Sequence, residues 1–192
     1  MPTINDFIEN ASPDNWLKYS YELNESANIL WKESNNITFD WDSHTKKKVE
    51  RPTISRNFML IAGLSIETIL KAYLISIHPS YVNEGRLDKK LKEHDLIKIL
   101  KLTTKLRFNK REMELMRILS EAIPNWGRYP IPLNFNEIKK ETILTKNIYN
   151  TYEKLYNKLY NIVRKKLLKG WDSGKGIGFK KLVIINNSMK HI

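Results

Sequence analysis

Two charged residues and a histidine have the types and spacing of a polar site inside a helical protein. Glu67 and Lys71 stand four residues apart in an otherwise apolar stretch. That spacing forms an ordinary ion pair along one helix face, but a charge retained among apolar residues usually has a further partner. His94 stands directly before Asp95 at the start of another apolar stretch. The pair is therefore either a simple intrahelical one or bonded to His94 or to residues 124–132.

The histidine has two roles open to it. His94 either closes the start of a helix by hydrogen bonding, or carries protons or binds phosphate, because its charge changes near neutral pH. Asp95 is well placed as the N-cap of that helix. We therefore expect a polar cluster of Glu67, Lys71, Asp95, Trp126 and Tyr129, with His94 as a candidate catalytic group beside it.

Residues 124–132, with the sequence PNWGRYPIP, interrupt a helical pattern with three prolines, two aromatic residues and an arginine. The prolines fix the path of this connection. Trp126 and Tyr129 either anchor the loop over the end of a bundle or stack on bases. Arg128, the second candidate catalytic residue, is an exposed surface arginine, a structural group bonded to helix-end carbonyls or to Glu67, or a phosphate ligand.

The chain is strongly basic, with 33 Lys and Arg against 21 Asp and Glu and a formal net charge of +12. From Glu137 to the end there are 13 basic and 4 acidic residues, so this segment contributes most of the excess. Such a segment favours a polyanion such as RNA or DNA, although a lysine-rich composition also arises from an AT-biased genome. The candidate nucleic-acid-binding residues are Lys158, Arg164, Lys165, Lys166 and Lys169.

Several classes of site are disfavoured. The chain has no cysteine, which excludes disulfides and thiol chemistry and fits a cytoplasmic protein. Its four histidines lack the partners and spacing of a zinc site, and the sequence predicts neither a metal nor a cofactor. The segment GKGIGF at 174–179 lacks the strand, the Lys-Ser/Thr ending and the helix of a phosphate-binding loop. No signal peptide is recognised, and the longest nearly apolar run, 58–66, is too short to span a membrane.

Periodic apolar residues and capping residues predict five helices. They are expected at residues 12–34, where Ser12 precedes Pro13; at 55–77, which Ser55 can cap; from Asp95 onward; from Asn109, which resembles a capping box with Glu112, to Pro124; and at 137–169. Residues 37–41 alternate between apolar and polar, as in a short strand or an extended arm, and the lysines that follow are expected in a solvated loop. The predicted fold is an all-α antiparallel bundle of four to five helices in a single domain, 1–169. Residues 170–192 form a glycine-rich basic tail, either a docked strand or disordered.

The central pattern resembles the HEPN family, small all-α domains of toxin–antitoxin, abortive-infection and nucleotidyltransferase-linked systems. The resemblance covers about residues 55–165. It rests on "GLSIETILKAYL" at 63–74, with its Glu-x-x-x-Lys-Ala core, then "EHDLIKIL" at 93–100 with its His-Asp-Leu start, and then "WGRYP" at 126–130. It implies a helical bundle that is often dimeric, with either metal-independent RNA cleavage or a non-catalytic RNA- or nucleotide-binding role.

The sequence departs from the nuclease members of that family, which carry an Arg followed by four to six residues and a His. The nearest approach here is Arg86 and His94, with seven residues between them. We therefore expect an RNA- or nucleotide-associated protein of a prokaryotic defence or toxin–antitoxin system. A divergent metal-independent ribonuclease is one alternative. The other is a non-catalytic interaction subunit, a homodimer or part of a complex, in which Trp41 and Trp171 face a partner chain.

Overall fold

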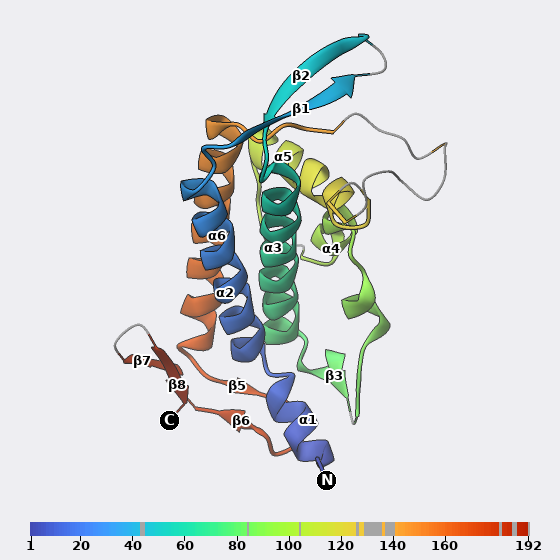
Figure 1. Ribbon diagram of the computed structural model, residues 1–192. Helices are drawn as coiled ribbons and strands as arrows, with labels where there is room; N and C mark the ends of the chain where they lie inside the picture. Colours follow the sequence, from blue (N-terminus) through green and yellow to red (C-terminus); the bar gives the residue numbers. More distant parts are fainter. Residues whose placement is uncertain are drawn as a thin grey trace.

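The computed structural model describes residues 1–42, 45–83, 85–103, 105–125, 127–128, 136, 141–180, 182–185 and 188–191. Figure 1 shows a bundle built around helix α3, which packs against α2, α4, α5 and α6. The fold is thus mostly helical, as predicted, but the described residues also form four small two-stranded sheets. The α-helices are α1 (Ile4–Asn10), α2 (Pro13–Lys32), α3 (Ser55–Ile77), α4 (Leu96–Leu102), α5 (Lys110–Ala122) and α6 (Lys146–Leu167).

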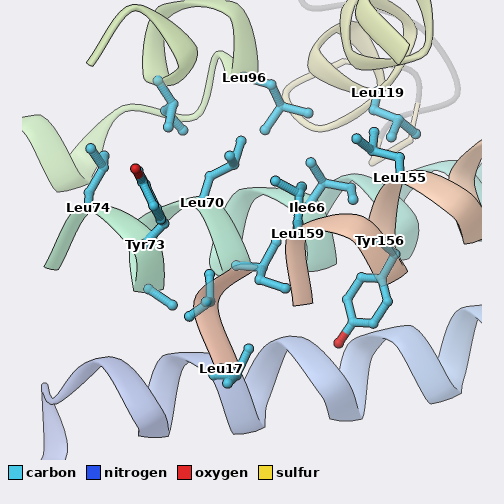
Figure 2. Packing of buried hydrophobic residues seen from close by; sticks show 14 of the residues in the cluster. Leu17, Ile66, Leu70, Tyr73, Leu74, Leu96, Leu119, Leu155, Tyr156 and Leu159 are labelled. Carbon is cyan, nitrogen blue, oxygen red and sulfur yellow. The ribbon is translucent and has the colours of Figure 1, made fainter. Parts of the chain in front are cut away.

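Helix α3 is the core of the bundle because apolar side chains cover most of its circumference. Ile66 and Leu70 are completely buried. In Figure 2 both lie between Leu17 of α2 on one side and the helices that cover the opposite side. By length and composition α3 could also cross a membrane, but 83% of its most apolar window is buried inside the molecule. Burial of this kind is typical of the central helix of a bundle.

The predicted caps of the two short helices are confirmed. Asp95 is the N-cap of α4 and accepts hydrogen bonds from the backbone N–H groups of Ile97 and Lys98. Asn109 and Glu112 form a reciprocal capping box at the start of α5. Helix α2 also begins at Pro13, as predicted, although the Ser12 hydroxyl makes no capping hydrogen bond.

Two helix predictions need correction. Helix α6 begins at Lys146 rather than near residue 137, because the Thr145 hydroxyl accepts the N–H of Ile148 and caps the helix there. Residues 141–145 precede it without helical structure, and 137–140 lie outside the described residues. Helix α1 was not predicted, although Thr3 and Asp6 form a capping box at its start.

The segment before α6 packs on the start of α3. Ser55 was predicted to cap α3, but it is the first helical residue, and Ile54 occupies the N-cap position. The Ser55 hydroxyl instead accepts the N–H of Leu144 at 2.9 Å. Beside it, Arg56 forms a two-point ion pair with Glu141. The start of α3 is therefore held by side chains from a segment some 85 residues away.

The alternating segment forms a hairpin of β1 (Ile37–Asp42) and β2 (Lys47–Pro52). The lysine run was expected in a loop, but Lys47 and Lys48 lie in β2. Between α3 and α4, the chain contains two very short strands and two 3-10 helices. These elements are η1 (Pro79–Tyr81), β3 (Val82–Asn83), β4 (Arg86–Leu87) and η2 (Lys89–Lys92).

The glycine-rich segment after α6 is docked rather than detached. Gly170 ends the helix region with a positive φ of 88°, and strands β5 (Trp171–Asp172) and β6 (Gly178–Phe179) pair behind it. Trp171 belongs to the hydrophobic core, and its Nε1 donates to the carbonyl of Ile75 at 3.3 Å. The expectation that Trp171 faces a partner chain is therefore wrong. Strands β7 (Leu182–Ile185) and β8 (Ser188–His191) follow.

Candidate functional site

A buried ion pair lies on the central helix. Lys71 Nζ donates to Glu67 Oε1 at 2.6 Å, and both side chains are almost fully buried. The four-residue spacing on α3 brings the two groups together. Removing two charges from water is costly, and their mutual attraction repays this only when further hydrogen bonds satisfy the remaining groups. Glu67 therefore needs another partner.

His94 is that partner. Its Nδ1 lies 3.0 Å from Oε1 and 3.1 Å from Oε2 of Glu67. The His94 side chain is 57% exposed, whereas that of Glu67 is 7% exposed. The imidazole is thus the exposed end of a cluster whose other two members, Glu67 and Lys71, are buried. The structure thus brings together Glu67 and Lys71 of the predicted polar cluster with His94, the candidate catalytic residue.

The geometry gives the histidine a defined chemistry. A carboxylate that contacts Nδ1 favours the tautomer with its proton on that nitrogen and orients the ring. Nε2 is then the ring nitrogen available to a ligand, and no described residue forms a hydrogen bond to it. The cluster can therefore accept or donate a proton through Nε2 of His94.

The backbone around His94 is fixed from both sides. Glu93 Oε1 accepts the N–H groups of His94 and Asp95, and the bond from Asp95 contributes most to lowering the pKa of that carboxyl. Ser120 of α5 donates its hydroxyl to Asp95 Oδ1 at 2.9 Å and accepts the N–H of Leu96. Burial alone would raise the pKa of Asp95, but the bonds from Ser120 and the helix N–H groups lower it overall. Asp95 is thus a positioning residue for His94.

The turn after α5 is pressed against α3 close to this cluster. A Cβ on Gly127 would lie 2.5 Å from the carbonyl oxygen of Ala122 and 3.1 Å from the Cβ of Leu60. One turn further along α3, a Cβ on Gly63 would lie 2.9 Å from a side-chain atom of Ile123. The two glycines therefore permit α5 and its turn to approach the stripe of α3 that carries Glu67.

Arg128 does not join the cluster within the described residues. Its backbone N–H donates to the carbonyl of Asn125, and its side chain is exposed. The described contacts of the Glu67 carboxylate are with Lys71 and His94 and not with Arg128. Trp126 and Tyr129 lie outside the described residues. Their expected roles as loop anchors or stacking platforms stay predictions.

The basic residues predicted on the last helix lie in different surroundings. Lys158 Nζ contacts both carboxylate oxygens of Glu112 at 3.0 and 2.9 Å and donates to the carbonyl of Arg107 at 2.7 Å. It therefore ties α6 to the start of α5. Lys165 and Lys169 are exposed. The remaining two, Arg164 and Lys166, are half-buried.

A basic pocket in the α3–α4 connection was not predicted as a site. Its volume is about 610 Å³. Lys90 lies against Tyr81, donating a hydrogen bond of 3.2 Å to its hydroxyl, and this bond raises the pKa of the ammonium group. Asp88 accepts the backbone N–H of Lys90 at 2.8 Å as the N-cap of η2. The signal in the sequence was the charge run RLDKKLK at 86–92. The lining residues are Ser80, Asn83, Arg86, Leu87, Asp88, Lys89, Lys90 and Lys92.

In the described part of the chain, no three His, Asp or Glu side chains gather around a common point. No protein-family model matches the sequence, and neither the curated proteins nor the solved structures yielded a match.

Proposed function

We propose that this chain is a HEPN-like protein that binds RNA or nucleotide phosphates, in a prokaryotic defence or toxin–antitoxin system. The observation that carries the proposal is the basic pocket, whose lining includes one arginine and three lysines. Its last lining residue, Lys92, stands two residues before His94 in the chain. Support also comes from the mostly helical fold and from the order of the HEPN-like motifs.

The charges of the pocket favour an anion. Arg86, Lys89 and Lys92 supply cationic groups, while Asp88, the one acidic residue among the described lining residues, uses Oδ1 as a helix cap. An arginine beside lysines suits phosphate, because the guanidinium offers two parallel donors and the ammonium groups add point charge. A pocket of about 610 Å³ is within the usual size of ligand sites.

Fluorescence anisotropy with a labelled single-stranded RNA, at several salt concentrations, tests the proposal. We expect the Lys89→Glu/Lys92→Glu double variant to lose about 10-fold or more in affinity, and to lower the salt slope by about 0.7 for each cation removed. The control is Lys18→Glu/Lys32→Glu, which makes the same charge change at two exposed positions of α2. An equal loss in both variants, or RNA binding that ignores salt, would rule out the pocket as the phosphate site.

A second candidate function, metal-independent RNA cleavage, is favoured by the hydrogen bond between His94 and Glu67. Cleavage of this kind needs a base and an acid near the 2′-hydroxyl and a cation at the phosphate. His94 can serve as the proton carrier through Nε2. Arg128 and Arg86 are the candidate cations, and the sequence departs from the usual nuclease spacing in this respect.

A further inference from the structure

The β1–β2 hairpin carries its apolar side chains on the outside. Ile37, Phe39 and Trp41 are 59%, 60% and 64% exposed. The alternate residues of the same strand are polar and are half-buried. One of them, Asp40, forms an ion pair with Arg51 of β2. The usual arrangement of a surface hairpin, apolar residues inward and polar residues outward, is therefore reversed.

A face of this composition is costly to leave in water. Large aromatic side chains bury 150 to 250 Å² when they are covered, so the three residues together expose roughly 300 to 400 Å² of mostly apolar surface. The largest apolar patch on a typical monomer is of this size and is often functional. Figure 1 shows the hairpin projecting beyond the end of the bundle, where a second molecule can reach it.

The strand register shows which charges share this face. Trp41 pairs with Lys48, and Phe39 pairs with Glu50. Directly paired residues of an antiparallel sheet lie on the same face. The outer face thus has two neighbouring rungs, one with an aromatic ring and a positive charge, the other with an aromatic ring and a negative charge.

We propose that this face binds the same face of a second copy of the chain. A two-fold axis that lies in the contact plane, perpendicular to the strands and between the two rungs, exchanges one rung with the other. It places Lys48 of each copy opposite Glu50 of the other, and Trp41 opposite Phe39. The contact is isologous and closed, as in most homodimers, and it is self-complementary in charge.

The same charges disfavour other occupants of this face. A polyanion would meet Glu50 beside Phe39, and the Lys48 and Glu50 charges cancel, so the face offers no net attraction to phosphates. A lipid surface would have to desolvate both charged groups. The exposed apolar area is about half of the roughly 800 Å² that each partner buries in a standard interface. The dimer is therefore weak and its population depends on concentration.

Sedimentation velocity of the full chain, from about 1 to about 200 μM, measures this association. We expect the sedimentation coefficient to rise with concentration in the native protein. Trp41→Ala and Phe39→Ala each weaken the dimer about 10-fold or more. Tyr19→Ala, which removes an equally exposed aromatic residue from α2, leaves it unchanged.

Charge exchange gives the sharpest test. Lys48→Glu alone places two acidic groups opposite each other at each contact, and Glu50→Lys alone places two basic groups there, so each single variant weakens the dimer. The Lys48→Glu/Glu50→Lys double variant restores it, because the complementarity is reversed but kept. Native protein that stays monomeric at every concentration overturns the proposal. It is also overturned if the double variant associates no better than the singles, or if Phe39→Ala reduces binding to single-stranded RNA or anionic vesicles and leaves self-association unchanged.

Discussion

His94 lies over the carboxylate of Glu67, with Nδ1 3.0 Å from one oxygen and 3.1 Å from the other. These residues are 27 positions apart in the sequence and belong to the start of α4 and the middle of α3. The contact places an exposed, titratable ring on a buried ion pair. Both the stability of the core and the chemistry of the surface therefore depend on the same carboxylate.

Removing one charge of the buried Glu67–Lys71 pair should cost more stability than removing both charges. Glu67→Gln leaves the Lys71 ammonium group buried without a counter-charge, and we expect the free energy of unfolding to fall by about 3 to 5 kcal/mol. Adding Lys71→Met, which removes the unpaired charge and keeps a similar shape, should recover most of that loss. Urea denaturation measures both variants.

An exposed ion pair supplies the control for this measurement. Glu114 and Arg117 of α5 lie 3.1 Å apart with both side chains more than half exposed. Glu114→Gln should therefore change the free energy of unfolding by less than about 1 kcal/mol. Equal losses for Glu67→Gln and Glu114→Gln would contradict the burial argument.

Metal-independent RNA cleavage, the second candidate function, predicts a role for His94 that can be tested without knowledge of the natural substrate. In the presence of EDTA, we expect the protein to cleave single-stranded RNA and His94→Gln to slow cleavage by about 100-fold or more, as for loss of a general acid or base. Lys18→Glu, on an exposed part of α2, should leave the rate unchanged. Cleavage by His94→Gln at the native rate would remove His94 from the mechanism.

The close packing of α5 and its following turn on α3 predicts a larger loss of stability for Gly127→Ala, in the turn, than for Gly63→Ala, on α3. Gly127→Ala places a Cβ 2.5 Å from the Ala122 carbonyl oxygen, which is backbone and cannot move aside, so we expect a loss of about 1 to 3 kcal/mol. Gly63→Ala meets the side chain of Ile123 at 2.9 Å and the Leu119 carbonyl oxygen only at 3.3 Å, and it gains about 0.5 to 1 kcal/mol of helix propensity. Its net effect should be smaller. Thermal unfolding compares the two, and a larger loss for Gly63→Ala would contradict this packing.

Local chemistry explains which elements were predictable. Asp95 and the Asn109–Glu112 capping box are read correctly because a cap depends on residues within one turn. The cap at Thr145 was overlooked. Its hydroxyl caps the last helix, which is therefore shorter than predicted, although the apolar pattern continues before it. Predicting that boundary requires choosing between two local signals, and the contacts of residues 141–144 with the start of α3 reinforce the later start.

Long-range contacts explain what the sequence did not reveal. Charge in an apolar stretch pointed to Glu67 and Lys71, and the His94 contact followed from that reasoning as one of several alternatives. The ion pair of Lys158 with Glu112 was missed, because it joins helices 46 residues apart. Alternation alone did not show that Ile37 and Phe39 point outward, since it indicates two faces of a strand but not which face is covered. Trp41 was expected at the surface only in the alternative of a partner chain, and it is exposed.

A buried tyrosine predicts how stability depends on pH. Tyr152 is completely buried between α3 and α2. Its hydroxyl donates to Asn24 Oδ1 at 2.9 Å and also contacts Ser65 Oγ at 2.8 Å. Burial is the main reason that the pKa of Tyr152 is raised far above its usual value of 10.0. Tyr156, on the next turn, is raised for the same reason.

The raised pKa values of these two tyrosines predict that stability falls at high pH. Above about pH 10 the unfolded chain ionises both tyrosines, while the folded protein keeps them protonated, so the stability that is complete below that pH is lost as the pH rises. Each group contributes a loss of about 1.4 kcal/mol for every pH unit above 10.

Tyr152→Phe should cost about 1 to 3 kcal/mol near neutral pH, because Asn24 loses its donor, and should make the fall in stability above pH 10 less steep. Urea denaturation across this range measures both effects, with Tyr19→Phe as an exposed control near neutral pH. A variant as steeply pH-dependent as the native protein would show that Tyr152 ionises equally in both states.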